Sequence, residues 1–269
     1  MPQNPVLPLA LVAALAAAAP AAAEAPTTAS ETAVLARTVA GEPDDRRPLA
    51  RLRGPLCLVV AATDQDFTRT VAKRIVANAQ AAGIRTRSAG CTANALVNFT
   101  DNPRGQMQAV RDDGRKLFRR MSEKEIDTAL AARDPAYVFQ AVEQTPRWGE
   151  GDAGVGGAGI ENWSSERSFL RTPEDMLSTM VVVDSAAISG LSPVQLADYV
   201  TLRLLAPTGE IAMDNPEAPR TVLSLFAAPD AAPQELTRFD RTYLRTLYKM
   251  PRTAFAEEVL AETARVAAK

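Results

Sequence analysis

Short apolar runs alternate along the chain with segments of helical periodicity. The runs at residues 55–61 and 180–184 are almost wholly apolar, which is typical of strands buried on both faces. Two further strands are expected at residues 84–87 and 95–99. Because a helical segment separates the first strand from the next two, the order β-α-β-β predicts an α/β fold with a mixed sheet and helices on at least one face.

Helical periodicity is clearest directly after the first strand. Phe67, Val71 and Ile75 are spaced four residues apart, which predicts an amphipathic helix that ends at Gly83. Proline after Ser192 suits the first turn of another helix. Further helices are expected at residues 105–120, from Ser122, from Thr237 and at residues 254–266.

The N-terminal segment has the pattern of a signal peptide. Residues 2–23 carry no charged side chain, and an apolar run leads into three alanines that suit cleavage after Ala23. An uncleaved anchor is the alternative reading. Pro20 interrupts the run before the ~20 apolar residues that a spanning helix needs, and this favours the signal peptide. We therefore expect a protein exported to the periplasm or the medium of a bacterium.

The remaining chain is expected to divide into two parts. Residues 24–50 are rich in alanine, threonine, proline and glutamate without sustained apolar periodicity, which predicts a flexible linker. Residues 51–269 are expected to form one α/β domain, because their length and apolar content suit a single large core.

Acidic and basic residues nearly balance, and the net charge is −2. This balance gives no overall electrostatic signal for nucleic acid or for an anionic membrane. After residue 23 no segment is apolar for long enough to span a bilayer. The expected partner is therefore an envelope protein or polymer, whose identity the sequence does not give.

Two cysteines, Cys57 and Cys91, follow the expected cleavage site. An even number of cysteines in an oxidising compartment favours a disulfide between them. Two separate buried thiols are the alternative. Two thiolates without histidine would leave a tetrahedral zinc site half built, so no zinc site is expected here.

The sequence contains no histidine, and this excludes several mechanisms together. Serine and cysteine nucleophiles lack the usual imidazole base, and an HExxH zinc site cannot form. We expect neither a metal ion nor a cofactor. Carboxylate pairs remain at Asp64 and Asp66, at Asp112 and Asp113, and at Glu174 and Asp175. They would serve a hydrolase only if carboxylates converged across a cleft, and helix caps or solvated faces are the favoured explanation.

A glycine-rich loop is expected at residues 144–165, between Trp148 and Trp163. Its glycines at 154–159 match G-x-G-x-x-G, but no strand leads into them, so the dinucleotide-binding geometry is not predicted. Mobile loops that carry aromatic residues often form binding edges or lids. Tryptophans that anchor such a loop in the core would give the same pattern, and both readings stay open.

The segment Val194–Asp198 carries a family resemblance. It looks like a zincin metallopeptidase helix in which Val194 and Asp198 replace the two histidines and Gln195 replaces the glutamate. The order of elements over residues 56–248 resembles uncharacterised exported proteobacterial proteins, among them a domain-of-unknown-function family distantly similar to zincins. This resemblance implies a zincin-like fold without its metal.

The leading functional hypothesis is thus a non-catalytic exported protein that acts by binding in the periplasm or envelope. The alternative is a hydrolase of envelope polymers that uses carboxylates, or serine with a lysine base.

Overall fold

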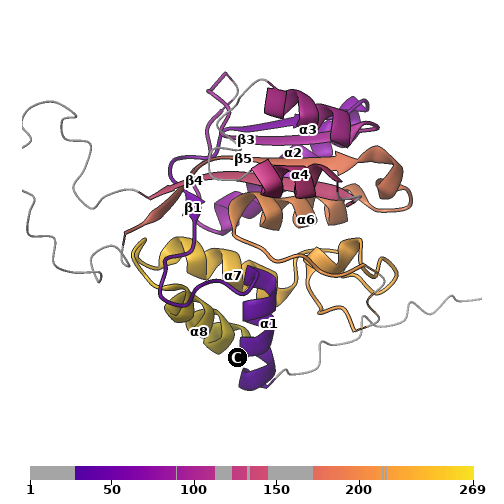
Figure 1. The fold of residues 1–269 in the computed structure, drawn as a ribbon. Helices are drawn as coiled ribbons and strands as arrows, with labels where there is room; N and C mark the ends of the chain where they lie inside the picture. Colours follow the sequence, from indigo (N-terminus) through magenta and orange to yellow (C-terminus); the bar gives the residue numbers. More distant parts are fainter. Residues whose placement is uncertain are drawn as a thin grey trace, which may run out of the picture.

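A computed structural model describes residues 28–88, 90–112, 123–131, 134–144, 172–213, 215 and 217–269. The expected signal peptide and the glycine-rich loop with both tryptophans lie outside these residues. Within them, the predicted mixed sheet with flanking helices is confirmed (Figure 1).

The sheet has five strands, and β5 is the longest of them. β5 pairs in parallel with β1 and β3, and β3 pairs in parallel with β2. β4 pairs with β5 in the antiparallel direction and closes one edge of the sheet. The strands are β1 (Arg51–Leu52), β2 (Leu58–Ala61), β3 (Ala95–Thr100), β4 (Ala136–Gln144) and β5 (Glu174–Asp184).

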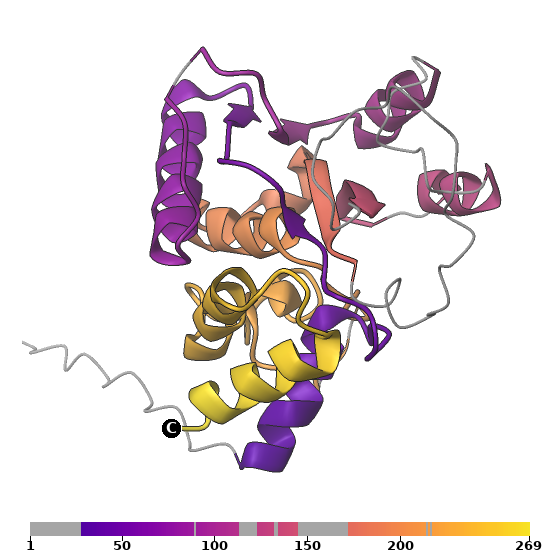
Figure 2. The ribbon, with the colours of Figure 1, turned by 90° about the vertical axis from the view of Figure 1, so that its left-hand side faces the viewer.

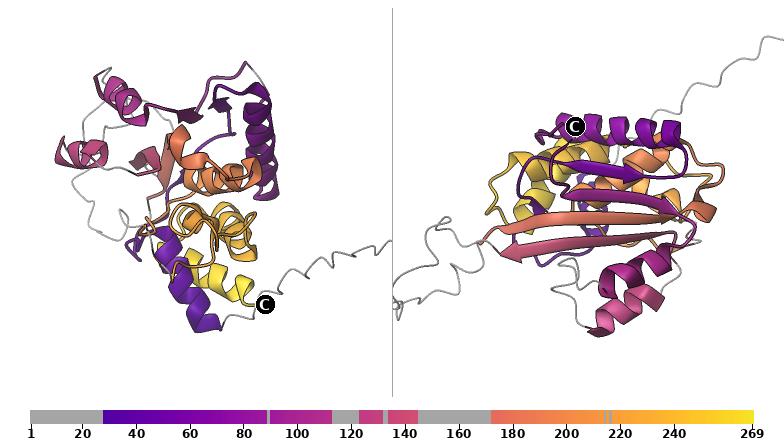
Figure 3. Two further views of the ribbon diagram at one scale, coloured as in Figure 1. Left: turned by 90° about the vertical axis from the view of Figure 1, so that its right-hand side faces the viewer. Right: turned by 90° about the horizontal axis from the view of Figure 1, so that it is seen from above.

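Helices cover both faces of the sheet. α2 (Gln65–Ala81) and α6 (Pro193–Leu205) share the main core with Val97 and Val181. α3 (Pro103–Asp112) and α4 (Glu123–Ala131) pack over β4 and β5 on the opposite face, where Val182 lies (Figure 3). The switch between Val181 and Val182 follows from the alternation of side chains along a strand.

A second helical layer lies below α6 (Figures 1 and 2). It contains α1 (Ala29–Ala40), α7 (Arg238–Lys249) and α8 (Ala256–Ala267), and their buried side chains belong to the same core as the sheet. Two short 3-10 helices, η2 (Ser185–Ile188) and η3 (Val222–Leu225), complete the described elements.

Local signals in the sequence explain where several helices begin and end. Asp64 accepts hydrogen bonds from two backbone N–H groups at the start of α2, and Gly83 follows its end with a φ of 87°. Ser192 and Thr237 cap α6 and α7 with reciprocal capping boxes. These helix positions agree with the sequence predictions.

Three strand predictions were wrong in detail. The run at 55–61 was expected to be buried on both faces, but β2 begins only at Leu58 and its side chains are half-buried or exposed. Residues 84–87 form only an isolated bridge, between Thr86 and Leu56, because they pair with the chain at this one position before β2 begins. β4 was missed, since Asp134-Pro135 reads as a break and the strand gains its stability from pairing along β5. β5 begins at Glu174, six residues before the apolar run that predicted it.

The linker prediction was wrong for Ala29–Ala40, which forms α1. Thr28 and Glu31 make a capping box, and Ala36 and Val39 are fully buried. The buried face of α1 packs against α8. Small residues such as Ala36 give little apolar signal in a sequence, although they allow close helix packing.

The C-terminal end of α1 is held by a close approach of two glycines. Gly209 donates its N–H to the Val39 carbonyl at 2.9 Å, and its own carbonyl accepts a hydrogen bond from the buried Arg203 of α6. A Cβ on Gly209 would lie 2.6 Å from the Thr38 carbonyl oxygen and 2.8 Å from the Cα of Gly41. Only glycine therefore fits at position 209.

The disulfide between Cys57 and Cys91 is confirmed, with their Cα atoms 6.1 Å apart. It joins the start of β2 to the loop before β3. Among the described residues, no helix is both long and apolar enough to cross a membrane.

The glycine contact predicts that Gly209→Ala destabilises the protein by about 1–3 kcal/mol, because the added methyl group overpacks a backbone contact. Urea unfolding measures the effect. Gly54→Ala is the matched control, since a Cβ at Gly54 meets no atom within 4 Å. Equal losses in the two variants would contradict the proposed role of the close approach.

Candidate functional site

The start of α6, where the zincin-like residues were expected, is a helix cap. Ser192 Oγ accepts a hydrogen bond from the Gln195 N–H at 3.1 Å, and Gln195 Oε1 accepts one from the Ser192 N–H at 3.2 Å. Gln195 Nε2 also donates to the Pro233 carbonyl at 3.3 Å. Both ends of the Gln195 amide are thus used in holding the backbone, and Val194 offers no ligand atom.

Asp198, one turn further along α6, is a buried acid that accepts four hydrogen bonds. Its side chain has no solvent exposure. Arg74 of α2 donates to both carboxylate oxygens at 2.7 Å, and Asn78 Nδ2 donates to Oδ1 at 2.6 Å. The Leu236 N–H donates to Oδ2 at 2.7 Å. Four N–H groups from two other parts of the chain therefore share one buried carboxylate.

The same contact changes the pKa of Arg74. Hydrogen bonds to Asp198 raise the pKa of the Arg74 guanidinium above its ordinary range, against the opposing effect of burial. Arg74 also reaches Glu235 at 3.1 Å on the surface. The pair is bidentate and charge-assisted, which is the strongest form of side-chain hydrogen bond.

A second buried carboxylate, Asp240, lies at the start of α7. Thr221 and Thr237 donate their hydroxyl groups to it, at 2.5 and 2.9 Å. The backbone N–H groups of Val222 and Thr237 donate at 3.1 and 3.0 Å. Burial raises the pKa of the Asp240 carboxyl above its usual 3.8, and these hydrogen bonds offset part of the effect.

Arginines gather around a third acid at the start of β5. Asp175 is buried and forms ion pairs with Arg252 and with Arg53, whose Nε lies 3.9 Å from the carboxylate. Arg51 donates to the Leu247 and Met250 carbonyls at the end of α7. Burial, and then the charge of Arg252, lower the pKa of Arg51 to about 10. This cluster joins the sheet to the lower helical layer.

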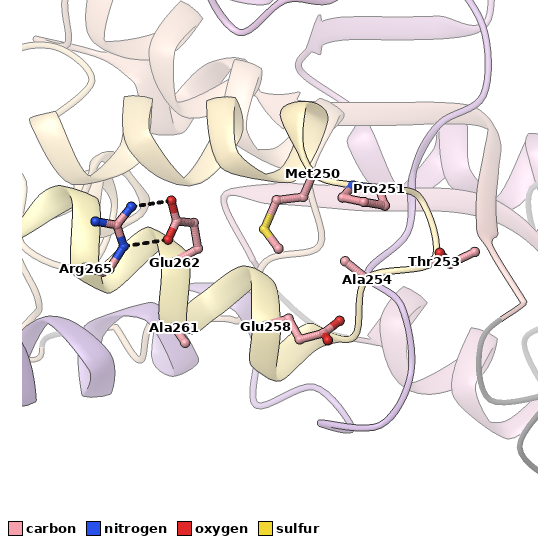
Figure 4. Close-up of a pocket in the computed structure, with 8 residues that line it drawn as sticks. All are labelled: Met250, Pro251, Thr253, Ala254, Glu258, Ala261, Glu262 and Arg265. Carbon is pink, nitrogen blue, oxygen red and sulfur yellow. Dashed lines mark hydrogen bonds and ion pairs between the residues drawn. The ribbon is translucent and has the colours of Figure 1, made fainter.

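A surface cavity of about 650 Å³ lies between the turn after α7 and the outer side of α8 (Figure 4). Its charged side chains already have partners. Glu262 pairs with Arg265 through two hydrogen bonds of 2.7 Å, and these lower the pKa of Glu262. Glu258 accepts the Phe255 N–H at 2.7 Å. The lining also includes Met250, Pro251, Thr253, Ala254 and Ala261.

These sites do not bring the expected functional residues together. Cys57 and Cys91 form the disulfide beside β2, and Trp148 and Trp163 lie outside the described residues. Of the carboxylate pairs, Asp64 caps α2 and Asp175 is held by arginines. Among the described residues, no three histidine, cysteine or acidic side chains are placed to hold a metal ion.

Sequence reasoning missed the partners of Asp198. Arg74 and Asn78 are spaced four apart beside the apolar face of α2, which is the only sign that both point toward the same neighbour. Their partner lies 124 and 120 residues away. No pattern in the sequence links positions so distant.

Comparisons of the chain with protein-family models, with curated proteins and with solved structures found no match.

We expect Asp198→Asn to lower the free energy of unfolding by about 3–5 kcal/mol, because it leaves Arg74 without its buried partner. Urea unfolding measures the loss. Glu235→Gln removes the exposed partner of the same arginine and should cost at most about 1 kcal/mol. A small loss in the Asp198 variant would show that this carboxylate does not hold the helices together.

The raised pKa of Asp240 predicts that the free energy of unfolding depends on pH. Because the folded state raises its pKa, its stabilising contribution is present near pH 3.8 and is lost as the pH rises through the folded value. The Tm of the wild type minus that of Asp240→Asn should therefore increase as the pH falls from neutrality. Thermal melts over this range test the sign, and a decreasing difference would mean that the hydrogen bonds outweigh burial.

Proposed function

We propose that this chain is an exported, non-catalytic protein that acts by binding a partner in the periplasm or cell envelope. The observation that carries the proposal is the state of Asp198. The acid at the position of a zincin's second histidine is fully buried and already accepts four N–H groups. A carboxylate in this environment serves the fold and leaves no lone pair directed at a substrate.

The rest of the motif helix supports the same reading. A catalytic zinc needs about three protein ligands and one open position. Val194 has no ligand atom, and Gln195 is committed to Ser192 and Pro233. We therefore take α6 to be a zincin-like helix without metal, whose polar residues act as structural anchors.

Export is supported by two features that belong to different parts of the chain. The first is the uncharged N-terminal segment that ends at Ala23. The second is the disulfide between Cys57 and Cys91, since disulfides persist in oxidising compartments.

The hydrolase alternative would use the cavity beside α8, which contains two carboxylates. Glu258 and Glu262 lie one turn apart on one helix, so they do not face each other across a cleft. Glu262 is kept ionised by Arg265, whereas a general acid needs a raised pKa. Both features favour a binding function over glycoside or peptide hydrolysis at this cavity.

The proposal predicts no turnover of envelope polymers. The mature protein would be incubated with peptidoglycan fragments, polysaccharides and peptides over a range of pH values. Its product formation should equal that of the Glu258→Gln/Glu262→Gln variant. Turnover that disappears in this variant would establish the hydrolase instead.

Crosslinking in the envelope, read by mass spectrometry, should recover a stoichiometric partner, and recovery of the protein alone would count against binding.

A further inference from the structure

The outer face of α7 carries a row of four basic side chains, Arg238, Arg241, Arg245 and Lys249, all of them exposed. Their spacing of three, four and four residues places them on one side of the helix. The opposite side is buried in the core and carries Phe239, Tyr243 and Leu247. We name these four residues the α7 basic row. At 1.5 Å per residue, the row extends over about 16 Å.

Most of the row forms no close ion pair within the described residues, although the charge of Lys249 is near enough to Glu262 of α8 to help lower the pKa of that acid. Arg241 lies 3.9 Å from Glu235, but Glu235 is already paired with Arg74. Arg238 reaches only the Val266 carbonyl, at 3.5 Å. No described carboxylate lies within ion-pair distance of Arg238, Arg245 or Lys249. A nearly neutral chain thus presents a local positive field, which its net charge of −2 conceals.

The surface beside the row does not suit a small ligand. Arg241 and Arg245 border a crevice toward α2, but its volume is only about 30 Å³. This is close to the volume of one water molecule in the liquid. An anion that contacts Arg241 and Arg245 would therefore bind on the surface of the row and not inside this crevice.

The row also lacks the features of a protein interface. Such interfaces depend on apolar or aromatic residues near their centre. The exposed large apolar residues of the described structure are Val34, Val59 and Met213, and none of them belongs to α7. A row of cations without an apolar centre suits a surface of many phosphate groups, with which guanidinium groups form bidentate hydrogen bonds.

We propose that the α7 basic row binds the anionic phospholipid surface of an envelope membrane. This inference rests on the proposed function, because attachment to the membrane would place the proposed binding protein in the envelope. Each lysine or arginine near an anionic bilayer strengthens binding about fivefold. Four such residues give reversible attachment that salt weakens, since exposed charges are screened.

The test measures binding of the mature protein to vesicles of phosphatidylglycerol and phosphatidylcholine in equal parts, by co-sedimentation. Wild-type protein should bind at low salt, release at molar salt, and ignore vesicles of phosphatidylcholine alone. The variant Arg245→Glu/Lys249→Glu, which removes no hydrogen bond of the described structure, should bind at least about 30-fold more weakly. The fourfold change of the row to glutamine should lose several hundredfold.

The matched control changes four exposed basic residues outside α7 to glutamine: Lys73, Arg85, Arg87 and Arg220. Its change in net charge equals that of the fourfold glutamine variant, and its vesicle binding should stay within about fivefold of wild type. Equal losses in the row variants and the control would overturn the proposal. Binding to soluble polyphosphate or to an acidic protein without binding to vesicles would also overturn it.

The two proposals fail in different ways. Loss of vesicle binding together with recovery of a crosslinked partner would refute only the membrane site. Turnover that depends on Glu258 and Glu262 would refute the binding function itself, whatever the vesicles show.

Discussion

The buried carboxylate of Asp198 is the interaction on which the arrangement of the helices depends. It lies on α6 and binds Arg74 and Asn78 of α2, so it fixes the two helices that cover one face of the sheet. Its bond to the Leu236 N–H holds the chain just before α7 begins. A buried charge is stable only when its lone pairs are satisfied, and here every donor comes from an element that must be correctly placed. One side chain therefore links the upper and the lower helical layers.

The other buried acids extend the same organisation. Asp240 ties the start of α7 to the segment before η3, and Asp175 meets Arg252 in the turn between α7 and α8. The lower layer is thus attached to the sheet after the end of α7, and the start of α7 is attached to the segment at η3. The outer side of α7 stays exposed and carries the α7 basic row. The structural role of the buried acids and the proposed binding role of the exposed cations belong to opposite sides of the same helical layer.

Much of the fold was predictable because it depends on local signals. The apolar run at 95–99, the glycine that ends α2 and the proline after Ser192 each act within a few residues. The disulfide followed from the even number of cysteines. By contrast, β4 depends on pairing with β5 and is not evident from its own residues. The start of α1 has a local signal in its capping box, but its packing against α8 is not evident from its small side chains. The partners of Asp198 could not be predicted, because they lie on a helix more than a hundred residues away. The spacing of Phe239, Tyr243 and Leu247 predicted the buried side of α7, and their burial is confirmed, but the row of basic side chains on the opposite side was not recognised.

The central claim is that the polar residues of α6 are structural and do not hold a metal ion. Native mass spectrometry of the mature protein, after exposure to a small excess of zinc, tests this claim most directly. We expect the mass of the metal-free protein, and the same result for folded Asp198→Asn. One zinc ion per chain in the wild type, and none in the variant, would show that Asp198 is a ligand and would contradict the account.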